Sequence, residues 1–133
     1  MRAGEELAPI ARAFTREDIA AYAEASGDRN PLHLDDAHAR AVGFPSVIAH
    51  GMLTFGHLAS AVRTWAGDGE VVSLRAQFRV PVFPGETVVA RGTVREVEGN
   101  RAMLDVWIEV ERGGTLEQPI RRSAAEIRLA GAL

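Results

Sequence analysis

Two stretches of the chain place hydrophobic residues three or four positions apart, the spacing of a helix with one buried face. The first begins at Thr15, whose hydroxyl can cap the first turn, with Asp18 three residues later. Gly27 is suited to end this helix, and a shorter helix is expected from about residue 35 to 42. Between the two, the pair Asn30-Pro31 disfavours a helix.

The second helical stretch follows His50 and Gly51 and ends near Gly67. It is the most apolar segment of the chain, and its hydrophobic residues cover a broad face. A helix this apolar is normally wrapped by other structure. The hydrophobic residues are Met52, Phe55, Leu58, Ala59, Val62, Trp65 and Ala66.

From residue 72 onward hydrophobic and polar residues alternate, as in strands with one buried face. Residues 9–14 are a candidate for one more strand at the start. Connections this short favour an antiparallel meander, so the predicted fold class is α+β, with one sheet facing one long helix. The expected strands cover residues 72–80, 88–94, 104–110 and 123–129, with turns at Pro81–Gly85, Gly99-Asn100 and Gly113-Gly114.

A length of 133 residues fits a single domain covering residues 1–133. The chain has no cysteine, which excludes disulfides, thiolate metal sites and a cysteine nucleophile. It has no lysine either, which excludes Schiff-base chemistry at a lysine. The net charge of −3 argues against a nucleic-acid partner. The chain shows neither the apolar run of a signal peptide nor one of membrane-spanning length, so we expect a cytoplasmic location and no membrane partner.

The segment Gly27-Asp28-Arg29-Asn30-Pro31-Leu32-His33 places a carboxylate and an imidazole five residues apart in a predicted loop. A bent loop can direct both side chains into one cavity, whereas a regular helix or strand would not bring them neatly onto one face. Such a pair suits proton transfer to and from water near neutral pH. The residues alone leave a second interpretation open, because Asp, Asn and Pro also form ordinary turns.

Gly51 lies where the apolar helix is expected to begin. The free backbone N–H groups of a helix start, together with the helix dipole, can receive an oxygen that gains negative charge. A glycine that only eases a tight turn would give the same pattern.

Taken together, GDRNPLHLD, IAHGMLT and FRVPVFPGETV resemble, in this order, the motifs of the MaoC-like (R)-specific enoyl-CoA hydratases and 3-hydroxyacyl dehydratases. The resemblance runs from about Phe14 through Val89, and the remaining residues fit the closing strands of that family. It implies a hot-dog fold, in which an antiparallel β-sheet wraps a long central helix. It also implies an enzyme, a hydro-lyase that interconverts trans-2-enoyl and (R)-3-hydroxyacyl thioesters.

The same resemblance implies the roles of four residues. Asp28 and His33 would jointly hold the water that is added to, or removed from, the C2=C3 bond. Asn30 would orient the loop or the water, and the Gly51 N–H would bind the thioester oxygen. No metal and no cofactor are implied, apart from the coenzyme A or phosphopantetheine that carries the substrate.

Three further residues are candidates for substrate binding. Met52 and Phe55 could line an acyl tunnel, although core packing is the more frequent role of apolar helix residues. Arg79, like Arg75, could meet the phosphates of coenzyme A, and an exposed strand face would explain both arginines equally well.

The remaining histidines are expected to be structural: His50 as a hydrogen-bonding residue, His57 as a packed or pocket-lining one, and His38 on a solvated face. A group of potential metal ligands has a spacing that matches no standard metal site. These residues are His33, Asp35, Asp36 and His38.

A single small sheet leaves its edge strands unpaired, and pairing with a second copy would cover them, so we expect a homodimer. Two alternatives stay open. The chain could be the catalytic subunit of a heterodimeric 3-hydroxyacyl-ACP dehydratase, or a hot-dog acyl thioesterase. The Asp–Asn-Pro–His segment argues against the thioesterase, and coenzyme A is preferred over acyl carrier protein as the carrier.

Overall fold

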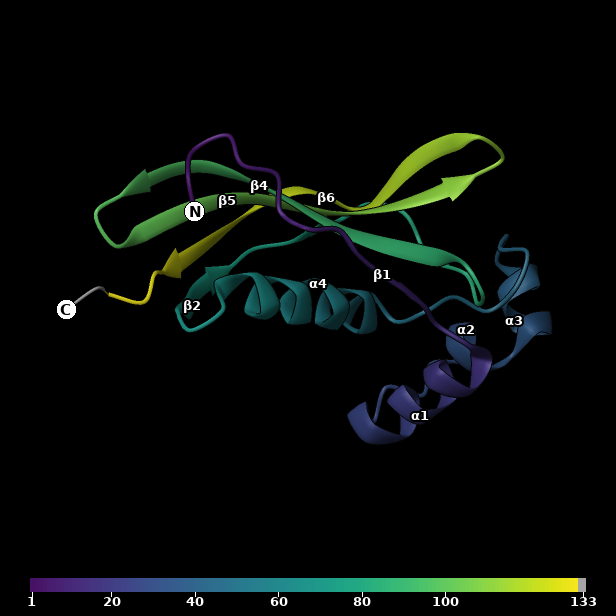
Figure 1. Ribbon diagram of the computed structural model, residues 1–133. Coiled ribbons are helices and arrows are strands. Elements are labelled where there is room, and N and C mark those ends of the chain that lie inside the picture. The colour runs from purple at the N-terminus through teal and green to yellow at the C-terminus, as the bar shows by residue number, and fades with distance from the viewer. Residues whose placement is uncertain (132–133) are drawn as a thin grey trace.

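The structure is a computed structural model, and it describes residues 1–131. Helix α4 (Gly51–Ala66) lies along one face of a curved antiparallel sheet (Figure 1). The predicted α+β arrangement, one sheet facing one long helix, is confirmed. The strands follow the order β1 (Ile10–Ala13), β4 (Thr87–Glu98), β5 (Arg101–Arg112), β6 (Thr115–Arg128) and β2 (Glu70–Leu74), and β3 (Gln77–Phe78) also pairs with β6.

Helix α4 packs its sheet-facing side into the core, where Leu58, Ala61 and Val62 are fully buried. Its start after His50 and its end at Gly67 agree with the prediction. The expectation that other structure packs around this apolar helix is confirmed on its core side, while Met52 in the first turn is 55% exposed. Within one chain, the sheet covers only one side of the helix.

Three short helices gather beside the N-terminal end of α4: α1 (Arg16–Ser26), α2 (Pro31–Leu34) and α3 (Asp36–Ala41) (Figure 1). The predicted cap of the first is confirmed, since Thr15 Oγ1 accepts the Asp18 N–H at 3.0 Å and Asp18 Oδ2 accepts the Thr15 N–H at 2.9 Å. Gly27 ends α1 in the left-handed conformation, with φ of 79°. The chain therefore turns sharply just before Asp28.

The segment after Gly27 corrects the prediction that Asn30-Pro31 would keep it from forming a helix. Residues Pro31–Leu34 form a short helix, because proline is well suited to the first helical position, where its missing N–H has no partner to lose. The Asn30 side chain caps this helix by accepting the Leu32 N–H at 3.0 Å. The restriction on the residue before proline still holds, since Asn30 itself is not helical.

The strand predicted at 72–80 is also corrected, because it is divided into β2 and β3. A register shift between Val71 and Ser73 interrupts the pairing of β2 with β6. A bulge of this kind changes which side chains point inward, and both Val72 and Phe78 are exposed where alternation predicted buried residues. The predicted strand at 9–14 is confirmed as β1. Strands β4 and β5 extend beyond both predicted ends, and β6 begins earlier than predicted, at Thr115.

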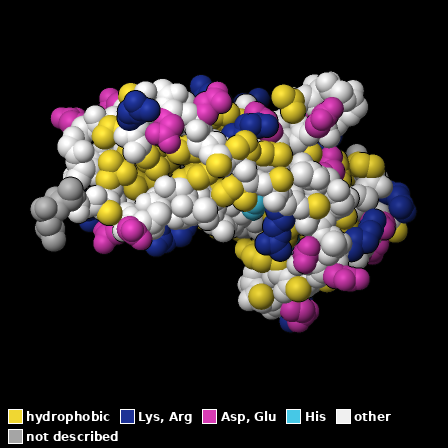
Figure 2. Space-filling view, in the orientation of Figure 1, with side chains coloured by type: hydrophobic (Ala, Val, Ile, Leu, Met, Phe, Trp, Pro, Cys, Tyr) yellow, Lys and Arg dark blue, Asp and Glu magenta, His cyan; other side chains and the backbone are white. Residues whose placement is uncertain are grey.

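Figure 2 shows hydrophobic side chains in a band between the sheet and α4, with arginine and acidic side chains mostly around its rim. None of the helices within residues 1–131 has the length and apolar character needed to cross a membrane.

Candidate active site

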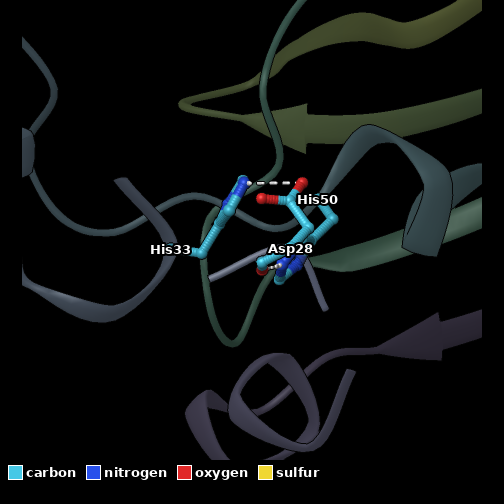
Figure 3. Close-up of side chains that lie close together, drawn as sticks. All are labelled: Asp28, His33 and His50. Atoms are coloured by element: carbon cyan, nitrogen blue, oxygen red, sulfur yellow. Dashed lines mark hydrogen bonds and ion pairs between the residues drawn. The ribbon is translucent and has the colours of Figure 1, made fainter. Parts of the chain in front are cut away.

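The structure brings Asp28 and His33 together beside the N-terminus of α4 (Figure 3). Asp28 lies in the turn after α1 and His33 lies on α2, and Asp28 Oδ2 is 3.8 Å from His33 Nε2. This separation is too long for a direct hydrogen bond. One water can nevertheless contact both atoms at about 2.8 Å from each, so the pair has room for a shared water.

The hydrogen bond on the other side of the His33 ring defines how the ring can act. His33 Nδ1 lies 2.7 Å from the Ile48 carbonyl oxygen, which can only accept a hydrogen bond. Nδ1 is therefore the protonated nitrogen of the neutral ring, and Nε2 carries the lone pair that faces Asp28. The arrangement directs two proton acceptors, an imidazole nitrogen and a carboxylate, toward one point.

The two acceptors differ in burial. The Asp28 side chain is 56% exposed, whereas only 11% of the His33 side chain is exposed. The Asp28 carboxylate makes one local contact, accepting the Asn30 N–H at 3.3 Å. Asn30, whose side chain caps α2, thus shapes the loop, which is one of the two roles that the sequence allowed for it.

His50 contacts both Asp28 and His33, and the sequence did not predict these contacts. Its ring stacks on that of His33, with centroids 3.7 Å apart and planes at 21°. Its Nε2 lies 2.8 Å from the Asp28 carbonyl oxygen. The expectation that His50 is a hydrogen-bonding residue is confirmed, but its contact with the Asp–His pair comes from the tertiary structure alone.

Asp28, His33 and His50 also offer three potential metal-ligand atoms within 4.8 Å of one another. The nearly parallel rings do not suit a shared cation, because a cation in the plane of one ring would lie well outside the plane of the other. Two of the potential metal ligands named from the sequence have other roles. Asp35 caps α3 by accepting two backbone N–H groups, and Asp36 accepts the Val47 N–H and pairs with Arg16. These carboxylates already have structural partners.

Gly51 borders a cavity of about 290 Å³. Its N–H is the first of α4 and has no hydrogen-bond partner among the described residues. A Cβ atom at this position would lie 3.3 Å from the Phe78 ring, so the absence of a side chain leaves the amide accessible at the cavity wall. The lining residues are Phe44, Ile48, Ala49, Gly51, Thr54, Phe78, Arg79, Val80, Pro81, Val82 and Pro119.

The cavity and the Asp–His pair are adjacent but distinct. Asp28 and His33 are not among the described residues that line the cavity. Two links join them: Ile48 lines the cavity and holds His33 through its carbonyl, and His50 is bonded directly to Gly51. The Gly51 cavity and the Asp–His pair are therefore joined through Ile48 and His50.

The three residues predicted to bind substrate have different positions. Arg79 lines the Gly51 cavity, and its role in binding substrate stays a prediction. Met52 lines a separate cavity of about 250 Å³, next to Tyr22 and His57. Phe55 is half-buried against the core and belongs to the lining of neither cavity. The acyl-tunnel role of Met52 and Phe55 stays a prediction.

Phe78 is the main cavity residue that sequence reasoning missed. The alternation of residues 72–80 predicts a buried side chain here, yet the exposed Phe78 ring stands against Gly51. The available signal was the motif FRVPVFPGETV, of which Phe78 is the first residue.

Arg112 of β5 holds the part of the cavity wall formed by Pro81 and Val82. Its guanidinium donates to both carboxylate oxygens of Glu86, at 2.6 and 2.8 Å, and to the Pro81 carbonyl oxygen. Burial raises the pKa of the Glu86 carboxyl, but the Arg112 and Phe83 donors outweigh burial, so this pKa lies below its usual value. The same Glu86 bonds raise the pKa of Arg112. This ion pair fixes the turn that supplies Pro81 and Val82 to the cavity.

Comparison with known proteins gives a consistent result. The family model described as "MaoC like domain" matches residues 2–112. The chain is 46% identical over 78 residues to 3-hydroxyacyl-thioester dehydratase Y of Mycobacterium tuberculosis, a match that covers 56% of this chain and 27% of that protein. It is 35% identical over 99 residues to the 3-hydroxybutyryl-CoA dehydratase of Methylorubrum extorquens, covering 71% of this chain and 63% of the relative. The chain thus spans less than two thirds of these curated relatives.

Among solved structures, the (R)-hydratase from A. caviae involved in PHA biosynthesis superposes with a TM-score of 0.84 at 28% identity, and the match covers 98% of each chain. The R-hydratase from Pseudomonas aeruginosa gives a TM-score of 0.85 at 28% identity, covering 97% of this chain and 82% of that one. The hot-dog fold and the family resemblance predicted from the sequence are confirmed.

Proposed function

Because this chain belongs to the MaoC-like domain family, we propose that it is a hydratase/dehydratase that interconverts trans-2-enoyl and (R)-3-hydroxyacyl thioesters. The observation that carries the proposal is the placement of Asp28 Oδ2 and His33 Nε2 3.8 Å apart, at the end of α4 where Gly51 offers a free amide. This arrangement supplies what water addition to a conjugated thioester needs: a held water, a proton acceptor and a donor for the thioester oxygen.

In the hydration direction, the oxygen of the shared water forms a bond to C3 as one proton passes to the Asp28–His33 pair. The C2=C3 electrons move toward the thioester, and C2 then receives a proton from the pair. One water is consumed and the pair returns to its starting protonation state. We treat the two groups as one coupled unit, because both contact the same water.

The Gly51 N–H binds the thioester oxygen in this mechanism. Negative charge develops on that oxygen as C3 is attacked, and an amide already aligned by the helix stabilises it without reorganisation. The positive end of the α4 dipole adds to this stabilisation. The reaction adds water without any net oxidation or reduction, so it requires no redox cofactor.

Coenzyme A is the proposed carrier, with acyl carrier protein as the alternative. Arg79 stands at the edge of the Gly51 cavity, and it lines a neighbouring hollow together with Arg121. Neither arginine takes part in an ion pair among residues 1–131, so both guanidinium groups are available for phosphate oxygens.

We propose that the active form is a homodimer. The free edge of β2 and β3, the exposed Phe78 ring and the exposed Asp28 carboxylate all lie open in a single chain. A second copy paired at that edge would bind the unpaired backbone N–H and C=O groups of the edge strand. It would also shield the site from bulk water. Light scattering of the purified protein, alone and with related subunits from the same source, tests this assembly against a heterodimer.

Activity is tested by offering the purified protein crotonyl-CoA, longer 2-enoyl-CoAs and the matching carrier-protein thioesters. Loss of enoyl absorbance without release of thiol indicates hydration. Release of free thiol would instead identify a thioesterase and overturn the proposal.

Substitution of the pair tests the mechanism. Asp28→Asn and His33→Ala should each lower kcat by about 100- to 10,000-fold, the usual contribution of a positioned acid–base group. His38→Ala and Asp68→Asn, which alter exposed groups outside the pair, serve as matched controls and should retain activity. Turnover is measured by loss of enoyl absorbance, and near-normal turnover in both the Asp28 and the His33 variant would rule out the proposed mechanism.

The carrier proposal predicts a selective effect of Arg79→Gln. The KM for crotonyl-CoA should rise about tenfold, equivalent to roughly 1.4 kcal/mol. The KM for crotonyl N-acetylcysteamine, which lacks every phosphate, should stay unchanged. The matched control is Arg95→Gln, because Arg95 is an exposed arginine of β4 that pairs with Asp105. An equal rise for both thioesters would show that Arg79 does not bind phosphate.

A further inference from the structure

We infer that His50 is a positioning residue, which fixes Asp28 and His33 relative to each other and to the Gly51 amide. The inference rests on the proposed function for its catalytic consequence, but the positioning itself is a structural claim. Three features of the His50 ring carry it: one hydrogen bond, one stacking contact and its place in the chain.

The hydrogen bond anchors Asp28. The carbonyl oxygen of Asp28 can only accept, so the proton lies on His50 Nε2, which donates across 2.8 Å. The other hydrogen bonds of Asp28 are local, with its N–H donating to Ser26 Oγ and its carboxylate accepting the Asn30 N–H. The His50 ring, only 2% exposed, therefore ties an exposed loop residue to the body of the protein.

The stacking contact orients His33. The Ile48 carbonyl holds one nitrogen of the His33 ring, which still leaves the ring able to rock about that bond. The flat face of His50, at 3.7 Å and 21°, restricts this motion and keeps Nε2 directed at Asp28. The Tyr22 ring packs against His50 in turn, with centroids 4.8 Å apart and planes at 64°.

The position of His50 in the chain links both of its contacts to the Gly51 amide. His50 is the N-cap residue of α4, and its carbonyl accepts the N–H groups of Leu53 and Thr54. Its side chain makes no capping hydrogen bond, although N-cap side chains commonly do so. Because Gly51 follows directly, any shift of His50 relative to α4 would move the pair relative to the amide.

The Nδ1 atom of His50, which has no hydrogen-bond partner, supports the same conclusion. It is the one side-chain polar atom that is buried and lacks a hydrogen-bond partner within residues 1–131. Such an atom is costly and needs an explanation. Phenylalanine would stack without this cost but could not donate to Asp28, and glutamine could donate but has no aromatic face. Histidine at position 50 supplies both contacts.

Two variants separate the contacts. His50→Phe retains the stacking face and loses the donor, whereas His50→Gln retains a donor and loses the aromatic face. In both variants kcat should fall about 10- to 100-fold, the scale expected of a small misplacement of reacting groups, with KM changed less than threefold. His57→Gln is the matched control, since His57 is also a buried histidine of α4 whose Nε2 bonds a backbone carbonyl, at 2.9 Å.

Nitrogen-15 NMR of the histidine rings provides a readout that does not depend on turnover. In the wild type, His33 should show a protonated Nδ1 and an unprotonated Nε2; in His50→Gln this pattern should move toward exchange between tautomers. His57→Gln should leave it unchanged, and circular dichroism checks that each variant is folded.

The outcomes separate the two proposals. If the wild type hydrates no thioester, the proposed function fails, and the NMR comparison alone decides the positioning claim. Folded His50 variants with unchanged His33 signals and kcat within twofold of wild type would overturn the inference. So would a loss confined to KM, which would assign His50 to substrate binding.

Discussion

Gly51 contributes to the site through its backbone. Its amide starts α4, has no partner among the described residues and borders a cavity that Phe78 also lines. His50 before it is extended, with φ of −61° and ψ of 137°, which is a conformation that a following proline accepts. Proline at the first helical position removes the N–H without breaking the helix. This allows the amide to be tested by itself.

Gly51→Pro should therefore lower kcat by roughly 100- to 1,000-fold, the usual effect of losing one donor to a developing oxyanion. Gly51→Ala keeps the N–H and adds a Cβ 3.3 Å from the Phe78 ring, so it reports the steric effect alone. The informative quantity is the ratio of kcat between the two variants. Equal activities would show that the amide does not bind the thioester oxygen.

At the scale of elements, the turn between β3 and β4 depends on a partly buried ion pair. Arg112 reaches from β5 to Glu86 and Glu117, and its guanidinium lies over the Phe83 ring at 4.9 Å. Removing one partner of such a pair leaves the other charge buried and uncompensated, which costs more than the pair itself gains. The cavity wall at Pro81 and Val82 therefore depends on Arg112.

Arg112→Met should reduce the free energy of unfolding by about 3 kcal/mol at pH 7. The folded-state pKa of Glu86 is depressed, so its contribution is present above the unfolded pKa and is lost as the pH falls through the folded pKa. The difference from wild type should accordingly shrink below about pH 4. Urea unfolding at pH 7 and at low pH measures both values.

Arg128→Met is the control for this experiment, because it breaks an exposed pair with Glu70 and should cost at most about 1 kcal/mol. If both variants lose the same stability, the Arg112 pair has no special structural role.

At the scale of the whole molecule, His57 joins the central helix to the first strand. Its Nε2 donates to the Ile10 carbonyl oxygen at 2.9 Å. Burial lowers the pKa of His57, and although the Ile10 hydrogen bond raises it, the net shift is downward. In the unfolded chain this ring binds its proton at higher pH than in the folded protein. Folding stability must therefore decrease as pH falls through the ordinary histidine range.

The free energy of unfolding should decline between about pH 7 and pH 5, with His57 contributing at most about 1.4 kcal/mol per pH unit. His57→Gln can keep the donor and cannot titrate, so its stability should vary less over that window. Urea midpoints for both proteins across the range provide the comparison. A variant with the same slope as wild type would exclude His57 as a source of the pH dependence.

The sequence by itself determined the features that depend on neighbours along the chain. The Thr15 cap, the α4 limits and the antiparallel run β4–β5–β6 follow from local spacing, and the motifs around Asp28, His33 and Gly51 identified the family. The meander predicted from residue 72 is wrong at its first strand, because β2 and β3 pair with β6 and not with β4. Local patterns carry this information because caps, periodicity and turns involve residues within a few positions of each other. The short helix after Asn30 is the exception: Asn30-Pro31 disfavours a helix through the proline but also suits a helix that begins at the proline, and the structure has the second.

Contacts between distant segments were decided only by the tertiary structure. The stack of His50 on His33, the Ile48 carbonyl that accepts from His33 Nδ1 and leaves Nε2 free, and the place of Phe78 beside Gly51 join residues far apart in the chain. The bulge in β2 and the position of Met52 in a different cavity likewise depend on how strands and helix pack. Hydrophobic periodicity indicates which face of an element is buried, but it does not say which other segment that face meets.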